Sequence, residues 1–161
     1  MSRLRIADGA LEAIRRHAAE TYPDECCGAL IGHADSGSPR AAESASSSAA
    51  GSAQPLQSVI SVVPLANTTD EGARTRFLVR PADYRHAEAR ARADGAELVG
   101  FYHSHPDHPA RPSEHDLDHA WPNLSYVIVA VERGRPGAIA SWRLRADRTT
   151  FDEEGLEETR T

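Results

Sequence analysis

The sequence contains no lysine, because all 18 of its basic residues are arginine. Such a chain offers no side-chain amine for an isopeptide bond, although codon usage alone is a sufficient explanation. The 24 acidic residues bring the formal net charge to −6. This charge argues against a nucleic-acid partner, because phosphate backbones are bound by basic surfaces.

Cysteine and long apolar runs are also scarce. The two cysteines are neighbours, Cys26 and Cys27, and neighbouring cysteines rarely pair because the disulfide is strained. We expect both to be small buried residues of a strand, with no disulfide framework. No apolar run approaches the length of a membrane span, and the first residues lack the apolar segment of a signal peptide. We therefore expect a cytoplasmic protein with no membrane partner.

What is present fits one globular domain. The chain has 161 residues, of which 40% are hydrophobic and 26% charged, and we place the domain at residues 1–150. The segment 34–55 is rich in Ala and Ser and has too few large apolar residues to order itself, so it is predicted to be a flexible insertion. The acidic tail 151–161 is predicted to fray.

Hydrophobic periodicity predicts strands and helices along the domain. The predicted strands are 4–6, 26–33, 56–67, 77–79, 97–105, 124–132 and 138–146. One helix is predicted after Asp8 and before Pro23, a second between Pro81 and Gly95, and a short third one from Ser113. The pattern indicates an α/β or α+β domain with a central mixed sheet flanked by helices.

Histidine is concentrated in one segment, 100–121, which holds five of the eight: His103, His105, His108, His115 and His119. The segment is either a polar loop or a metal site. The histidines at 108, 115 and 119 are most simply solvated, although they could bind a second ion.

His103 and His105 stand out because they lie two residues apart at the end of a predicted strand. That spacing puts both side chains on one face, where they can chelate one ion. Asp116 follows at the start of the short helix, after a proline-rich turn. Two His and one carboxylate are a usual ligand set for catalytic zinc, which lowers the pKa of a bound water. Ser113, on its own, is most simply the N-cap of this helix.

The pattern His-x-His-x₇-Ser-x₂-Asp resembles the motif of the JAMM (MPN+) zinc metallopeptidases. That family also has an upstream glutamate, and Glu25 in "YPDECCGALIG" occupies the matching place. The similarity runs from about Leu4 to about Ala146 and is closest to short bacterial and archaeal members. It implies an MPN/JAMM domain with a cytidine deaminase-like fold.

The resemblance also implies a role for each motif residue. His103, His105 and Asp116 would bind one zinc ion per chain. Glu25 would act as general base on the zinc-bound water and pass the proton to the leaving amine. Ser113 would donate a hydrogen bond to the oxyanion as the carbonyl becomes tetrahedral.

The implied substrate is the amide bond after the C-terminal diglycine of a ubiquitin-like or sulfur-carrier protein. A diglycine tail can approach closely as an extended strand and add to a sheet edge, which we place in the strand after residue 56 or near 77–80. Members of the family often form dimers, and the sequence leaves undecided whether this chain forms a homodimer.

Three alternatives remain. An inactive MPN scaffold that only binds partners would lack motif ligands, and all five are present. A zinc deaminase would carry His-x-Glu with Pro-Cys-x-x-Cys, which is absent. A metal-storage or metal-sensing protein would use the same histidines without needing Glu25.

Overall fold

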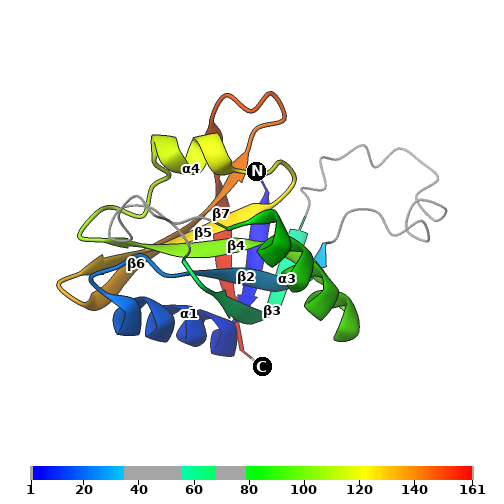
Figure 1. Ribbon diagram of the computed structural model, residues 1–161, viewed down its shortest axis with the longest axis horizontal. Helices are drawn as coiled ribbons and strands as arrows, with labels where there is room; N and C mark the ends of the chain where they lie inside the picture. Colours follow the sequence, from blue (N-terminus) through cyan, green and yellow to red (C-terminus); the bar gives the residue numbers. More distant parts are fainter. Residues whose placement is uncertain (1, 35–55, 68–78, 161) are drawn as a thin grey trace.

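The computed structural model describes residues 2–34, 56–67 and 79–160, and within them the strands pair side by side into a closed barrel in the order β1-β3-β2-β4-β5-β6-β7 (Figure 1). The strands are β1 (Arg3–Ala7), β2 (Cys27–Ala34), β3 (Leu56–Leu65), β4 (Glu97–Pro106), β5 (Ser125–Glu132), β6 (Arg135–Leu144) and β7 (Phe151–Thr159). The helices are α1 (Asp8–Thr21), α3 (Pro81–Ala93) and α4 (Glu114–His119).

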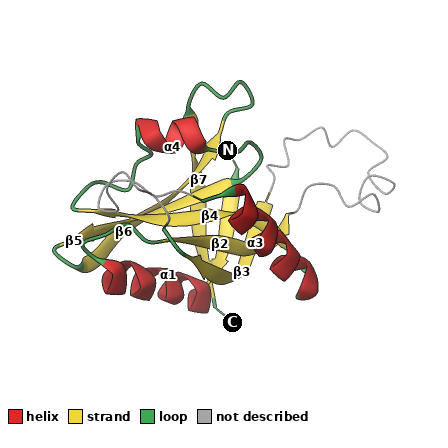
Figure 2. Ribbon diagram, in the orientation of Figure 1, coloured by secondary structure: helices red, strands yellow, loops and turns green. Residues whose placement is uncertain are grey.

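The sheet mixes parallel and antiparallel pairs. Strand β1 runs parallel to both β3 and β7, and β4 runs parallel to β5. The remaining neighbours, β2 with β3 and β4, β5 with β6, and β6 with β7, are antiparallel. With helices packed outside it (Figure 2), this mixed sheet confirms the predicted α/β class.

Helix α1 forms because its apolar residues recur at helical spacing. Ala10, Leu11, Ile14 and Ala18 are buried against the sheet, in one core with residues of β1, β4 and β5. The helix ends at Thr21, one residue before the Tyr22-Pro23 pair, where proline cannot continue it.

Helix α3 covers a second core on another part of the barrel. Pro81 stands at its first turn, where the missing N–H costs nothing. Its buried residues, Ala87 and Ala91, are small, so the helix axis can lie close to the ring of Phe101 on β4. Gly95 follows the helix in the left-handed conformation, with φ +70°.

The predicted frayed tail is wrong, since Phe151–Thr159 forms β7 between β1 and β6. Composition misled the prediction because one acidic side chain of this strand, Glu157, meets two arginines of β1. Glu157 pairs with Arg3 at 3.1 Å and with Arg5 at 3.4 Å. The strand therefore belongs to the barrel, and a domain boundary at residue 150 would cut it.

Two predicted segments fall mostly outside the described residues. Of the insertion 34–55, Ala34 closes β2 and the rest is not described. Of the predicted strand 77–79, Val79 is buried but lies in no strand.

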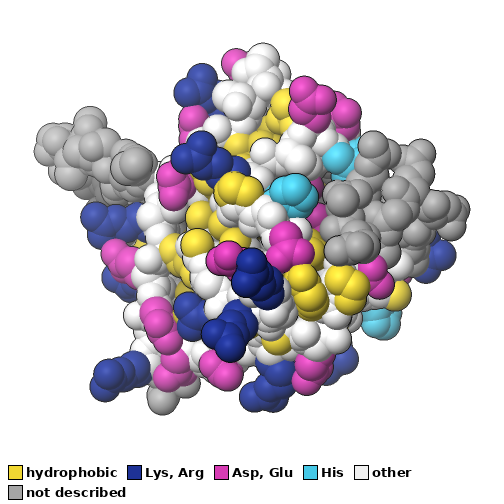
Figure 3. All heavy atoms as spheres, turned by 90° about the vertical axis from the view of Figure 1, so that its left-hand side faces the viewer, with side chains coloured by type: hydrophobic (Ala, Val, Ile, Leu, Met, Phe, Trp, Pro, Cys, Tyr) yellow, Lys and Arg dark blue, Asp and Glu magenta, His cyan; other side chains and the backbone are white. Residues whose placement is uncertain are grey.

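Cys26 and Cys27 are both buried and free, as predicted. Within the described ranges, no helix has the length and apolar character needed to cross a bilayer. Figure 3 shows acidic and arginine side chains interspersed on one face, so this face carries no broad basic surface for phosphate binding.

Candidate metal centre

Strand β4 carries two histidines whose imidazole rings lie close together. His103 and His105 lie on the same face of this strand, and their Nε2 atoms are 3.1 Å apart. Both residues are buried, with 1% and 6% of their surface exposed. The period-two spacing of the sequence thus has the predicted consequence.

Helix α4 adds a carboxylate, and Ser113 fixes its position. The Ser113 hydroxyl accepts a hydrogen bond from the backbone N–H of Asp116, and the Ser113 N–H donates to Asp116 Oδ2 at 2.8 Å. This reciprocal capping box starts the helix. It also holds Asp116 Oδ2 at 3.2 Å from His103 Nε2 and 3.3 Å from His105 Nε2.

The atoms His103 Nε2, His105 Nε2 and Asp116 Oδ2 have the spacing that tetrahedral coordination of a metal ion requires. Ligand bonds of ~2.0–2.1 Å to zinc place the ligand atoms ~3.3 Å apart, and the observed separations are 3.1, 3.2 and 3.3 Å. A search of the described residues for His, Cys, Asp and Glu side chains that could together hold a metal ion finds His103, His105 and Asp116. Zinc, the predicted cofactor, suits this mixture of imidazole and carboxylate ligands.

The electrostatics of the group favour a charged Asp116 carboxylate beside a neutral His103 imidazole. Burial by itself raises the pKa of Asp116, but His103, His105 and the Ser113 N–H together hold that pKa well below its usual range. Burial lowers the pKa of His103, and Asp116 only partly offsets this. Neutral imidazole and ionised carboxylate are the protonation states that bind metal.

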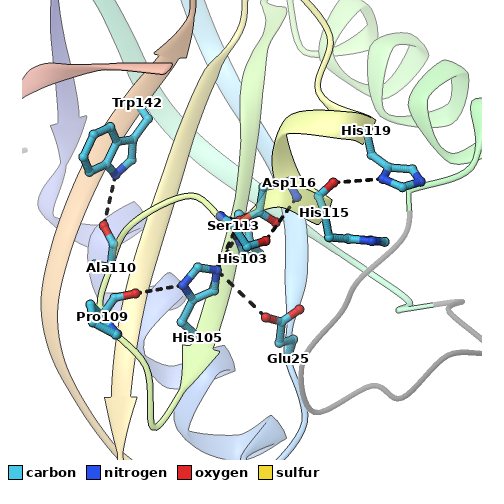
Figure 4. Close-up of polar contacts among 10 residues, drawn as sticks. All are labelled: Glu25, His103, His105, Pro109, Ala110, Ser113, His115, Asp116, His119 and Trp142. Atoms are coloured by element: carbon cyan, nitrogen blue, oxygen red, sulfur yellow. Dashed lines mark hydrogen bonds and ion pairs between the residues drawn. The ribbon is translucent and has the colours of Figure 1, made fainter. Parts of the chain in front are cut away.

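Glu25 lies beside this group, two residues before the start of β2 (Figure 4). Its Oε1 atom is 3.9 Å from His105 Nε2, and the residue is 4% exposed. Its Oε2 atom has no hydrogen-bond partner within the described part of the chain. Burial, and after it the charge of Asp116, raises the pKa of Glu25 to about 9.

The segment that carries Glu25 is tied to β4 and to the end of β3 by residues to which the sequence analysis assigned no role. The Cys26 N–H donates to Ser104 Oγ at 2.8 Å, and the Ser104 N–H donates to the Cys26 carbonyl. Asn67 donates from Nδ2 to the Glu25 carbonyl at 3.2 Å. Ser104 stands between the two ligand histidines, and this position was the one available signal.

The other histidines of the cluster do not join the metal group. His108 is exposed on the loop after β4. His115 and His119 lie on α4 and stack on each other, with ring centroids 4.2 Å apart. His119 Nδ1 is 2.9 Å from the His115 carbonyl.

A groove of about 750 Å³ begins at Ser113 and continues over β6 and β7. Its lining includes Ala138, Trp142 and Phe151, with Glu114 and Glu153 among the acidic residues. Trp142 donates from Nε1 to the Ala110 carbonyl at 3.1 Å, which fixes the loop between the groove and the metal group. In Figure 4, Trp142 and Glu25 lie on opposite sides of His105.

Comparison with known proteins identifies the family of this chain. Residues 8–145 match the family model described as prokaryotic homologs of the JAB domain. A desampylase of Haloferax volcanii is 31% identical over 132 residues, which cover 79% of this chain and 80% of the relative.

Two solved structures share the fold. A protein of Desulfitobacterium hafniense superposes with a TM-score of 0.76 at 28% identity, over 98% of this chain and 94% of that one. A JAB1/MPN domain protein of Archaeoglobus fulgidus superposes with a TM-score of 0.55 at 19% identity, over 99% and 100% of the two chains. The fold and family that the motif predicted are thereby confirmed, and the chain belongs to the prokaryotic JAB-domain family.

Proposed function

We propose that this protein is a zinc-dependent metallopeptidase that hydrolyses the amide bond after the C-terminal diglycine of a ubiquitin-like or sulfur-carrier protein. The observation that carries the proposal is the buried His-His-Asp group with the Glu25 carboxylate 3.9 Å from one of its imidazoles. Membership of the JAB-domain family and the likeness to a desampylase support it.

His103, His105 and Asp116 hold the zinc ion in this proposal. When bound there, zinc supplies a Lewis acid and brings the pKa of water toward neutrality. The capping box at Ser113 and the burial of both imidazoles keep the three ligand atoms in place, so little reorganisation is needed at the moment of reaction.

Glu25 carries the proton. Burial and the charge of Asp116 disfavour its ionised form, and the positive charge of a zinc ion held by the ligand group would favour that form again, so that the carboxylate can accept a proton. It takes a proton from the attacking water and delivers it to the leaving amine, which departs neutral. Its Oε2 atom, without a partner in the described chain, is available for the first of these steps.

Ser113 is proposed to stabilise the oxyanion. Its Oγ accepts the Asp116 N–H, which leaves the hydroxyl hydrogen free to donate. The side chain is exposed next to the metal ligands, where the carbonyl oxygen of a bound substrate would develop charge.

The diglycine tail is proposed to approach along the end of β3. In the described residues, β1 pairs with β3 only from Leu56 to Val59, while β2 pairs along it as far as Leu65. The stretch from Ile60 to Leu65 therefore has no described strand on its other side. It ends next to the Glu25 segment, because the Cys27 thiol contacts the Leu65 carbonyl. A tail without side chains can add there through backbone hydrogen bonds.

The fragment beyond the cleaved bond is proposed to enter the groove at Ser113. This groove, of about 750 Å³, has room for side chains, which the diglycine lacks, and its lining carries Arg111 beside Glu114 and Glu153. Ala138→Trp, at an exposed lining position, should raise KM several-fold for a substrate whose leaving group is a polypeptide. Turnover of the same diglycine tail bearing a small aromatic amine should stay unchanged. An equal effect on both substrates would contradict this use of the groove.

The proposed function is tested by cleavage of a ubiquitin-like protein that carries a peptide extension after its diglycine. Wild type should release the extension, and Glu25→Gln should lower kcat by about 10²–10⁴, the contribution of a general base, while one zinc ion per chain is retained. Asp116→Ala should lose both zinc and activity. Glu12→Gln and Asp118→Ala, at exposed positions on α1 and α4, are the matched controls.

Two outcomes would contradict the proposal. A wild-type protein that stays folded but takes up no zinc when supplied would favour the inactive scaffold. A Glu25→Gln protein that binds zinc and retains full turnover would exclude the proton-transfer role.

A further inference from the structure

Asp107 joins three separate segments of the chain next to the metal group. It follows β4 directly, and its backbone N–H donates to the Val131 carbonyl at 2.7 Å. Its carboxylate accepts from the Tyr22 hydroxyl at 2.7 Å and from the Arg133 N–H at 2.9 Å. Tyr22 comes from the end of α1 and Arg133 from the turn between β5 and β6, so all three segments meet at one side chain.

The backbone at this point is held in an uncommon conformation. Asp107 has φ +57°, in the left-handed region that Asp and Asn tolerate better than most residues. The chain there reverses sharply, and the His108 N–H reaches back to the His105 carbonyl. After this reversal, the Pro109 carbonyl faces Nδ1 of His105.

The Pro109 carbonyl determines which nitrogen of His105 faces the metal group. His105 Nδ1 lies 2.8 Å from this oxygen. A carbonyl only accepts hydrogen bonds, so Nδ1 carries the hydrogen and Nε2 presents its lone pair toward Asp116 and His103. The orientation of the ligand thus depends on where the turn from Asp107 to Pro109 places one backbone oxygen.

We propose that Asp107, held by Tyr22, is a positioning residue that orients His105 for metal binding. It touches neither metal nor substrate and acts through the Pro109 carbonyl. The inference rests on the metal-binding role proposed above for His105 but not on the identity of the substrate. It also explains why the end of α1 is tied by a side-chain hydrogen bond to a turn far along the sequence.

Three variants separate the hydrogen bonds from the backbone conformation. Asp107→Ala removes both side-chain acceptors. Asp107→Asn keeps an acceptor and tolerates the positive φ, so it is the conservative rescue. Tyr22→Phe leaves Asp107 unchanged and deletes one of its donors. Asp147→Ala is the matched control, because Asp147 also holds a turn, by accepting from the Thr149 N–H and hydroxyl, and contacts no metal ligand.

The experiment measures the zinc dissociation constant by competition with a chromophoric chelator, using metal alone and no substrate. Thermal unfolding and the visible spectrum of the Co²⁺-loaded proteins are recorded in parallel. Asp107→Ala should weaken zinc binding by about 10-fold, the lower end of the effect of losing a direct outer partner of a ligand, because the Pro109 carbonyl remains but is less well placed; it should also shift the Co²⁺ spectrum. Tyr22→Phe should have a smaller effect in the same direction, and Asp107→Asn should restore most of the affinity.

Asp147→Ala should lower the unfolding temperature without changing either metal readout. Wild-type zinc affinity and an unchanged Co²⁺ spectrum in Asp107→Ala would overturn the inference, whatever its unfolding temperature. Equal weakening in Asp107→Asn and Asp107→Ala would overturn it too, because the retained acceptor would then have no role. A wild-type protein that binds no zinc would overturn the proposed function and this inference together.

Discussion

Ser113 acts through two groups, and substitution can separate them. Its backbone N–H holds Asp116 Oδ2, whereas its hydroxyl caps α4 and is proposed to stabilise the oxyanion. Ser113→Ala keeps the N–H, so zinc should stay bound. We expect a loss of about 1 kcal/mol of stability from the cap and a fall of about 10²–10³ in kcat from the missing oxyanion donor.

The measurements are zinc content, unfolding temperature and kcat on the same samples. Ser113→Thr restores a hydroxyl and should recover most of the stability and turnover. If Ser113→Ala lost stability yet turned over at the wild-type rate, Ser113 would be a helix cap and nothing more.

The two cysteine thiols should be unreactive in the folded protein. Burial raises the pKa of Cys26 to about 11 and that of Cys27 to about 12. At pH 8 both are almost entirely protonated, and the thiolate is the reactive form. Iodoacetamide should therefore modify neither cysteine in the native protein and both in denaturant, as mass spectrometry would show. Rapid native labelling would mean that this part of β2 opens readily.

At the scale of single residues, the sequence predicted the candidate ligand and catalytic residues and missed the contacts that hold them in place. The ligand histidines and Asp116 lie within fourteen positions and form a recognisable pattern. The contact between Tyr22 and Asp107 joins residues 85 positions apart, and no local pattern marks such a pair. The sequence named Ser104 only as a neighbour within the motif, and its contact with Cys26, like that of Asn67 with Glu25, was missed for the same reason.

Among the elements, β4 and β5 approach each other so closely that one position must be glycine. A Cβ on Gly100 would lie 1.9 Å from the backbone oxygen of Ser125, its partner in the parallel pair. A backbone atom cannot move aside as a side chain does, so Gly100→Ala should cost at least the 1–3 kcal/mol typical of overpacking. It should also disturb the strand that carries His103.

Gly9 in α1 is the matched control, because nothing lies within 4 Å of a Cβ placed there. Gly9→Ala should stabilise the protein by up to about 1 kcal/mol through helix propensity. Chemical denaturation of both variants tests the pair. Equal stability of Gly100→Ala and wild type would show that β4 and β5 can separate without penalty.

Most elements were predictable because their apolar residues recur at a clear period. The buried residues of α1 and the apolar run of β5 gave such signals. Strand β7 did not, because "FDEEGLEET" is mostly acidic. Its strand character comes from pairing on both sides and from arginines on β1, and these are tertiary contacts that a local reading of the sequence does not contain.

At the scale of the whole molecule, the order of strands around the barrel could not be predicted from the sequence. The sequence predicted a mixed sheet, but β3 lies between β1 and β2, and β7 returns to β1. The pairing of β7 with β1 links strands from the two ends of the described chain. Pairings this distant depend on which edges remain open once the local elements have formed.

Closure of the barrel by β7 should be essential for stability. A chain ending at Thr150 loses the pairs of β7 with β1 and with β6. It also loses Leu156, which packs on the core beneath α1, and Phe151, which packs on the core beneath α3. Both side chains are only partly buried, so they contribute less than the ~3–6 kcal/mol that full burial of two such side chains is worth. The lost strand pairs add to this, and a typical domain is stabilised by only ~5–15 kcal/mol. The exposed edges of β1 and β6 would in addition invite aggregation.

We therefore expect the shortened chain to show no cooperative thermal transition by circular dichroism. A chain ending at Thr159 keeps all of β7 and should unfold at the wild-type temperature. Glu157→Gln in the full-length chain removes only the charge that pairs with Arg3 and Arg5, and these exposed pairs should contribute less than about 1 kcal/mol. If the chain ending at Thr150 unfolded cooperatively at the wild-type temperature, β7 would be an accessory to the barrel and residues 1–150 would be the domain after all.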